Sequence, residues 1–272
     1  MVWPEAAVQR GTDTPARVFR SRGGSAANVA VAAAPFVPTR FVGCVGDDPL
    51  GDHLVAELTA AGVEPRVQRR GRTGTVVVLV DVDGERTFLP DRAAAADLDD
   101  VDATVLDDVA VLHVPAYGLH TGRTAASVRS LLEQARDHGV ELSFDASSWA
   151  VLRALGVEHY RSLVEDLRPA VLFANADEAR ELDLLARPLP VDVVLKDGAR
   201  PTTVLGTDGS RLQVPVQAVD GVRDSTGAGD AFAAGWLSAR MDGLDVPARV
   251  ERGHDLARRV LLSPGAGSQE GT

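Results

Sequence analysis

The chain has 272 residues, with a formal net charge of -11 at pH 7 and a pI near 5.0. This acidic balance argues against nucleic acid or an anionic membrane surface as the main partner. Its single cysteine excludes an internal disulfide, and no run approaches the roughly 18 apolar residues of a membrane span. Since no signal-peptide pattern opens the chain, we expect a cytoplasmic protein.

Short β-branched runs alternate along the chain with helical patterns, which is typical of βαβ units around a mainly parallel sheet. The predicted helices are residues 25–34, 50–61, 121–138 and 175–185, and the predicted strands are residues 40–45, 110–114, 140–145, 170–174 and 191–196. We therefore expect an α/β fold with helices on both faces of a central sheet. Because there is no internal repeat and no linker, we expect residues 1–272 to form a single domain.

Residues 73–89 break this alternation. They predict two strands around the pair Asp83 and Gly84, a turn that suits a β-hairpin. We expect this hairpin to belong to a separate small sheet.

The double glycine at Gly23 and Gly24 permits a tight entry into an alanine-rich helix, which Ser25 can cap. Asn28 would face the same side as Gly24. An amide both donates to and accepts from vicinal hydroxyls, so this position suits a polyol. Close helix packing through small residues, with Asn28 exposed, explains the same pattern equally well.

Residues 224–230 read Asp-Ser-Thr-Gly-Ala-Gly-Asp and lead directly into an apolar helix. The small residues Gly227, Ala228 and Gly229 can point their backbone N–H groups into open space, where the helix dipole favours a phosphate. Asp230 would lie beside that anion and could accept a proton from a hydroxyl that attacks phosphorus. An ordinary glycine-capped helix start is the alternative.

Together, these segments resemble the signatures of the ribokinase-like (PfkB) carbohydrate kinases. The amino-terminal signature is matched by residues 23–28 and by residues 42–51, which read VGCVGDDPLG, and the carboxy-terminal signature by residues 224–230, with Ser225 in place of a threonine. The resemblance runs from about Gly11 onward. It implies transfer of the γ-phosphoryl group of ATP to a hydroxyl of a sugar or nucleoside. In that reaction Asp230 is the base, the amides of 227–229 are the anion hole, and Gly23, Gly24 and Asn28 contact the acceptor.

The resemblance also implies metal sites. Asn175 and Glu178 match an Asn-x-x-Glu motif whose glutamate acts through water on Mg²⁺, which keeps part of its hydration shell in proteins. Asp224 and the Thr226 carbonyl correspond to positions that hold a monovalent cation such as K⁺ in some relatives. Without the resemblance, Asn175 followed by acidic residues is simply a good helix start.

Nucleotide contacts are implied for Asn175 and Thr226, and for the loop that contains Lys196 and Gly198. Pro201 stands in that loop where the family has a further glycine. His254 occupies the place of an adenine-side asparagine, where it could stack on the base, although a surface histidine explains it as well. The histidines show no zinc-ligand spacing.

In the family, a hairpin like that of residues 73–90, with a partner that here would come from residues 8–20, forms a lid over the sugar and often a homodimer contact. Relatives also open with a complete central strand that carries an aspartate for the substrate. Against that pattern we expect residues 1–3 to lie near the end of this strand and the substrate aspartate to be absent, either because the true start lies upstream or because the protein lacks this strand. Residues 92–96 replace a Gly-Ala-Asn stretch of many relatives.

A non-catalytic binding relative that lacks the first strand is therefore an alternative to the kinase. Asp230 argues against it, because a binding protein needs no base. A nicotinamide-dependent oxidoreductase is disfavoured, since no Gly-x-Gly-x-x-Gly motif follows a first strand.

Overall fold

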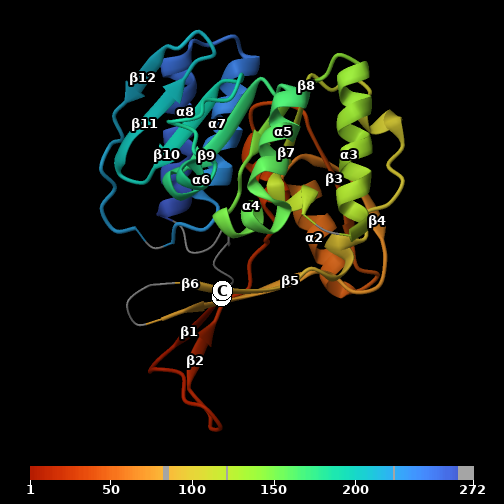
Figure 1. The fold of residues 1–272 in the computed structure, drawn as a ribbon. Helices are drawn as coiled ribbons and strands as arrows, with labels where there is room; N and C mark the ends of the chain where they lie inside the picture. The colour runs from red at the N-terminus through yellow and green to blue at the C-terminus, as the bar shows by residue number, and fades with distance from the viewer. Residues whose placement is uncertain (82–85, 121, 223, 263–272) are drawn as a thin grey trace.

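A computed structural model describes residues 1–81, 86–120, 122–222 and 224–262 (Figure 1). Its body is a six-stranded sheet in the order β12-β11-β10-β9-β8-β7. The four strands β7 to β10 pair in parallel, while β11 pairs antiparallel with β10 and with the edge strand β12. The bounds are β7 Val111–Pro115, β8 Glu141–Asp145, β9 Val171–Asn175, β10 Val193–Asp197, β11 Arg200–Leu205 and β12 Arg211–Val214.

Helices cover both faces of this sheet, as predicted (Figure 1). Along β9, Leu172 and Ala174 face one core cluster and Val171 and Phe173 face the other, and all four are fully buried. This explains why the strand is a continuous apolar run. On one side lie α3 Gly122–Asp137, α4 Trp149–Leu155 and α5 Val157–Leu167, and on the other α7 Ala228–Met241 and α8 Val246–Leu261.

A second, two-stranded parallel sheet pairs β3 (Thr39–Val45) with β4 (Val63–Arg69). In the described part of the chain, β3 does not pair with β7, and both strands line a cavity of about 3250 Å³. Helix α1 (Ser25–Ala33) contacts both β3 and β7, and α2 (Pro49–Ala60) packs on β4. The parallel strands thus form two separate sheets, and α1 contacts a strand of each.

A four-stranded small sheet, in the order β2-β1-β5-β6, projects from the body (Figure 1). Its hairpin of β5 (Thr75–Val80) and β6 (Arg86–Asp91) confirms the two predicted strands, although the predicted turn at 83–84 lies outside the described residues. The direct partner of β5 is β1 (Val2–Pro4), and β2 (Ala16–Val18) pairs with β1. Two expectations are therefore corrected: the amino-terminal contribution begins before residue 8, and residues 2–4 do not belong to the central sheet.

All five predicted strands are present within two residues at each end, but the one predicted at 40–45 is β3 and lies in the two-stranded sheet rather than in the six-stranded one. The predicted helix 175–185 is shorter: Asn175 is the N-cap of α6 (Ala176–Glu181), and the first residue of the predicted helix 121–138 is not described. Three short 3-10 turns complete the fold: η1 Ala93–Ala96, η2 Ala103–Leu106 and η3 Ala116–Leu119. Over the described ranges, no helix has the length and apolar character needed to span a bilayer.

Candidate active site

The predicted site residues line one cavity between the body and the small sheet, with the exception of Asp224. These residues come from segments far apart in the sequence, and several strands deliver them at their carboxyl ends, where ligands bind in open α/β sheets. They are Gly23, Gly24, Asn28, Asn175, Glu178, Lys196, Gly198, Thr226, Gly227, Ala228, Gly229, Asp230 and His254.

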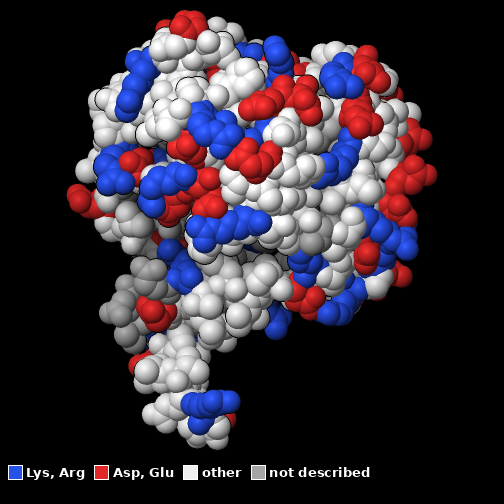
Figure 2. Space-filling model, viewed as in Figure 1, with Lys and Arg blue, Asp and Glu red and all other residues white. Residues whose placement is uncertain are grey.

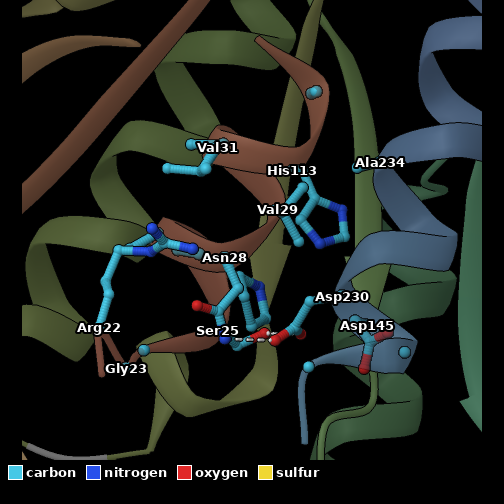
Figure 3. A pocket seen from close by; sticks show the side chains of 18 of the residues that line it. Arg22, Gly23, Ser25, Asn28, Val29, Val31, His113, Asp145, Asp230 and Ala234 are labelled. Atoms are coloured by element: carbon cyan, nitrogen blue, oxygen red, sulfur yellow. Dashed lines mark hydrogen bonds between the residues drawn. The ribbon is translucent and has the colours of Figure 1, made fainter. Parts of the chain in front are cut away.

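The amino-terminal ends of α1 and α7 meet in this cavity at Asp230 (Figure 3). Ser25 Oγ donates a hydrogen bond of 2.6 Å to Asp230 Oδ1, and Asn28 Nδ2 donates one of 2.9 Å to Oδ2. Gly24 makes this entry to α1 with a φ of 93°, a conformation that L residues rarely adopt. The predicted acceptor motif and the predicted base are therefore in direct contact across about 200 residues of sequence.

Burial is the main reason why the pKa of Asp230 is raised to about 6. The hydrogen bonds from Ser25 and Asn28 oppose this effect, because they lower the pKa. The nearby Asp145 raises this pKa further and Lys196 lowers it. A carboxylate with this pKa is mostly ionised near neutral pH and is a stronger base than an exposed aspartate. The Asn28 Oδ1 atom is buried and has no partner among the described residues, so it can accept a hydrogen bond from a ligand.

The glycine turn before α7 has the expected form, with one difference. Gly227 is the N-cap in the left-handed region at φ 81°, and Gly229 lies in the first helical turn, where N–H groups lack an intrahelical acceptor. The Ala228 N–H, however, donates to the Ser225 carbonyl at 3.2 Å, so this amide is not open as predicted. A Cβ on Gly229 would lie 3.2 Å from Lys196 Nζ, which shows how closely the ammonium approaches the turn.

Lys196 forms an ion pair with Asp145 at 2.8 Å at the carboxyl ends of β10 and β8. Burial alone would lower the pKa of Lys196, but Asp145, Glu178 and Asp230 raise it above its ordinary value, so it stays charged. Asp145 was not predicted as a site residue, although its position at the end of a buried strand was a usable signal. For Lys196 itself, the sequence offers a further signal: it is the only lysine of a chain that otherwise uses arginine.

Asn175 and Glu178 form a complete capping box at the start of α6. Asn175 Oδ1 accepts from the Glu178 N–H at 2.9 Å, and Glu178 Oε2 accepts from the Asn175 N–H at 2.7 Å. The helix-start interpretation is therefore correct for the local geometry. Glu178 is only 2% exposed, and burial together with Asp145 raises its pKa to about 7. A nearby cation would stabilise the charged form of this buried carboxylate.

Asp224 lies behind the turn, fully buried, and contacts the small sheet. Arg86 of β6 reaches it with Nη2 at 2.9 Å from Oδ1, and its Nη1 donates to Ser225 Oγ at 3.0 Å. The Thr226 N–H also donates to Asp224 Oδ1. Because a guanidinium already neutralises this carboxylate, a monovalent cation at Asp224 and Thr226 stays a prediction.

The two remaining nucleotide positions, Gly198 and His254, also line the cavity. Gly198 has a φ of 61° in the turn between β10 and β11, a conformation that favours glycine, and Pro201 lies within β11. His254 of α8 is half-buried, with Nε2 2.8 Å from Thr202 Oγ1 and its ring 5.5 Å from that of Phe232. His254 is therefore held in place rather than mobile on the surface.

No three His, Cys, Asp or Glu side chains among the described residues form a group that could bind a metal ion directly. Over the face of the molecule in Figure 2, acidic and basic side chains are interspersed and form no large patch of one sign. A metal at this site would depend on water and on phosphate oxygens as well as on protein ligands.

Comparison with known proteins gives consistent results. The model of the pfkB family carbohydrate kinases matches residues 5–271. An ATP-dependent ribose-1-phosphate kinase of Halopiger xanaduensis is 33% identical over 247 residues, which cover 85% of this chain and 77% of the relative. The solved adenosine kinase of Sinorhizobium meliloti has a TM-score of 0.81 at 25% identity and covers 92% of this chain and 79% of its own. A ribokinase II structure from E. coli with ATP and Mg²⁺ has a TM-score of 0.83 at 20% identity, and the match covers 97% of this chain and 90% of the E. coli chain.

Proposed function

The chain belongs to the pfkB family of carbohydrate kinases, and from this premise we propose which of its residues carry out the reaction. As a member it is an ATP-dependent phosphotransferase that acts on a hydroxyl of a sugar or nucleoside. The observation that supports our assignment best is the contact between Asp230 and the acceptor motif at Ser25 and Asn28. On this assignment, the base would lie beside the residues that hold the acceptor hydroxyl.

In the proposed mechanism, Asp230 accepts the proton of the acceptor hydroxyl as its oxygen attacks the γ-phosphorus. The new P–O bond forms while the bond to the leaving ADP oxygen breaks, and the proton remains on Asp230. The acceptor is held by Gly23, Gly24 and Asn28, whose unpartnered Oδ1 accepts from a second hydroxyl of the polyol. Positioning of this kind supplies much of the rate enhancement in phosphoryl transfer.

Lys196 and the turn at 227–229 would stabilise the charge on the transferring phosphoryl group. The Lys196 ammonium lies close to Gly229, and the first-turn N–H groups of α7 point from a helix N-terminus. Asp145 holds Lys196 in this position through the 2.8 Å ion pair. Thr226, Gly198 and His254, which line the same cavity, would contact the nucleotide.

The residues present fit a magnesium ion held through water. Glu178 is a buried carboxylate with a raised pKa, Asn175 adjoins it, and the described residues contain no direct three-ligand site. When bound, Mg²⁺ neutralises charge on the phosphates of ATP. Glu178 and Asn175 would orient the water shell of the ion.

The small sheet would act as the lid over the acceptor. It contributes lining residues to the cavity, and Arg86 connects it to the turn that carries the base. On one side, according to the strand pairing, the small sheet presents Val18, Val77 and Leu89, which are 66%, 44% and 52% exposed. In Figure 2 the projecting small sheet carries few charges.

An apolar face of this kind favours a homodimer through the small sheet, with each lid covered by the partner chain. The expected result is a dimer in light scattering that Leu89→Glu, a change at a 52% exposed residue, converts to a monomer. We place this dimer in the cytoplasm, where ATP and Mg²⁺ are available.

The acceptor can be identified with the purified chain and Mg-ATP over a panel of sugars, sugar phosphates and nucleosides. ADP release should occur with one class of acceptor, and mass spectrometry should find the phosphorylated acceptor in equal amount. Binding of ATP without ADP release on any acceptor would support the non-catalytic alternative instead. ADP release without a phosphorylated acceptor would mean transfer to water and would contradict the proposed acceptor chemistry.

A further inference from the structure

Ser25 has a contact that its place in the sequence does not explain. The predicted cap, Ser25, is instead the first residue of α1, because Gly24 is the N-cap. The hydroxyl of Ser25 donates to Asp230 Oδ1 at 2.6 Å, at the short end of the range for O–H···O bonds, as is typical of a charged acceptor. The hydroxyl is thus directed at the base rather than at the backbone of its own helix.

We infer, on the premise of the proposed function, that Ser25 is a positioning residue that fixes the orientation of the Asp230 carboxylate toward the acceptor. The terminal torsion of an aspartate is broad, so the carboxylate plane is not set by rotamer preference alone. Two donors from one rigid helix, Ser25 on Oδ1 and Asn28 on Oδ2, fix that plane. Each oxygen keeps a lone pair, so the acceptor hydroxyl can bind without displacing Ser25.

The same bond affects the charge state of the base. Burial is the main reason why the pKa of Asp230 is raised, and the Ser25 hydrogen bond is the largest effect that opposes it. Removal of a donor to the charged form raises the pKa of a carboxylate. The charged and titratable groups that face Asp230 from neighbouring elements are Asp145 of β8, Lys196 of β10, Arg22 before α1 and Tyr117 after β7.

The direction of the pH effect follows from the role of the base. Asp230 must be ionised to accept a proton, so kcat/KM falls as the pH drops through the pKa of this group in the free enzyme. In the wild-type protein we expect this acid limb near a pH of about 6. In Ser25→Ala the limb should move upward by about one pH unit, which corresponds to the loss of one charge-assisted hydrogen bond.

The test is the pH profile of kcat/KM between about pH 5 and 8.5 for wild type, Ser25→Ala and Ser25→Thr. The ratio of Ser25→Ala to wild type should be about tenfold lower at the acid end than at the alkaline end. Ser25→Thr, which keeps a hydroxyl, should restore the wild-type limb. Ser210→Ala, the same change at an exposed turn, should leave the profile unchanged, and thermal melting should show that all variants are folded.

Two results distinguish this positioning role from a direct contact with the acceptor and from failure of the proposed function. If Ser25 only contacts the acceptor, Ser25→Ala raises the acceptor KM and leaves the acid limb in place, which overturns the inference. Failure of the proposed function looks different: Asp230→Asn would then retain turnover, and the wild-type profile would have no acid limb to move.

Discussion

The ion pair between Lys196 and Asp145 gives the prediction with the largest expected effect. Replacement of Lys196 by methionine keeps an unbranched side chain of four heavy atoms but removes the terminal ammonium group. Asp145 would then be a buried carboxylate, 5% exposed, beside two further carboxylates and without a charged partner at hydrogen-bond distance in the described residues. Such a change is costly because an unpaired charge cannot be solvated in the interior.

The magnitude follows from this geometry. Removal of one member of a buried ion pair typically costs about 3–5 kcal/mol of unfolding free energy. For a chain of 272 residues this corresponds to a fall in Tm of roughly 5–9 °C. The double variant Lys196→Met with Asp145→Asn contains no unpaired charge at this position and should regain most of that stability.

Activity should behave differently from stability. If Lys196 neutralises the transferring phosphoryl group, Lys196→Met loses about 10²–10³ in kcat, and the double variant stays as inactive as the single one. The assays are thermal unfolding and ADP release on the same samples. Recovery of kcat in the double variant, or an unchanged Tm in Lys196→Met, would refute the reasoning.

Two further variants test the turn before α7. Arg86→Ala should lower kcat/KM for the acceptor about tenfold, because it leaves the buried Asp224 carboxylate without its cation. Arg86→Lys should restore only part of this kcat/KM, because a lysine cannot bridge Asp224 and Ser225 as the guanidinium does; an unchanged kcat/KM in steady-state assays of Arg86→Ala would contradict this. Gly229→Ala should lower kcat about tenfold, since the added Cβ would lie 3.2 Å from Lys196 Nζ and crowd it. The Tm should stay nearly unchanged, because alanine favours the helix. A kcat equal to that of wild type would show that the approach of Lys196 to this turn is unimportant.

The central strands could be predicted because burial on both faces leaves a direct record in the sequence. Val171, Leu172, Phe173 and Ala174 form an unbroken apolar run that ends at a polar residue, and the structure ends β9 there. The three-residue strand β1 has no such record, because three residues carry no periodicity and its pairing with β5 depends on tertiary contacts. The composition of the small sheet was therefore only partly predictable.

The candidate site was predictable where a motif has local geometry. The turn at Gly227 requires a left-handed conformation, and the capping box of Asn175 and Glu178 follows from adjacent residues. The pairs that join distant segments were not predictable: Ser25 with Asp230 is separated by 205 residues and Asp145 with Lys196 by 51. Such contacts depend on how the sheet and α1 bring chain segments together, which local preference does not encode.

The central claim is that Asp230 is the base of a phosphoryl transfer, and its most direct test is Asp230→Asn. Phosphorylation of the identified acceptor by this variant should fall by about 10²–10⁴, while calorimetry should show that ATP still binds. Asp220→Asn, the same change at an exposed position ten residues earlier, should retain wild-type turnover. Turnover of Asp230→Asn within a few-fold of wild type would contradict the account.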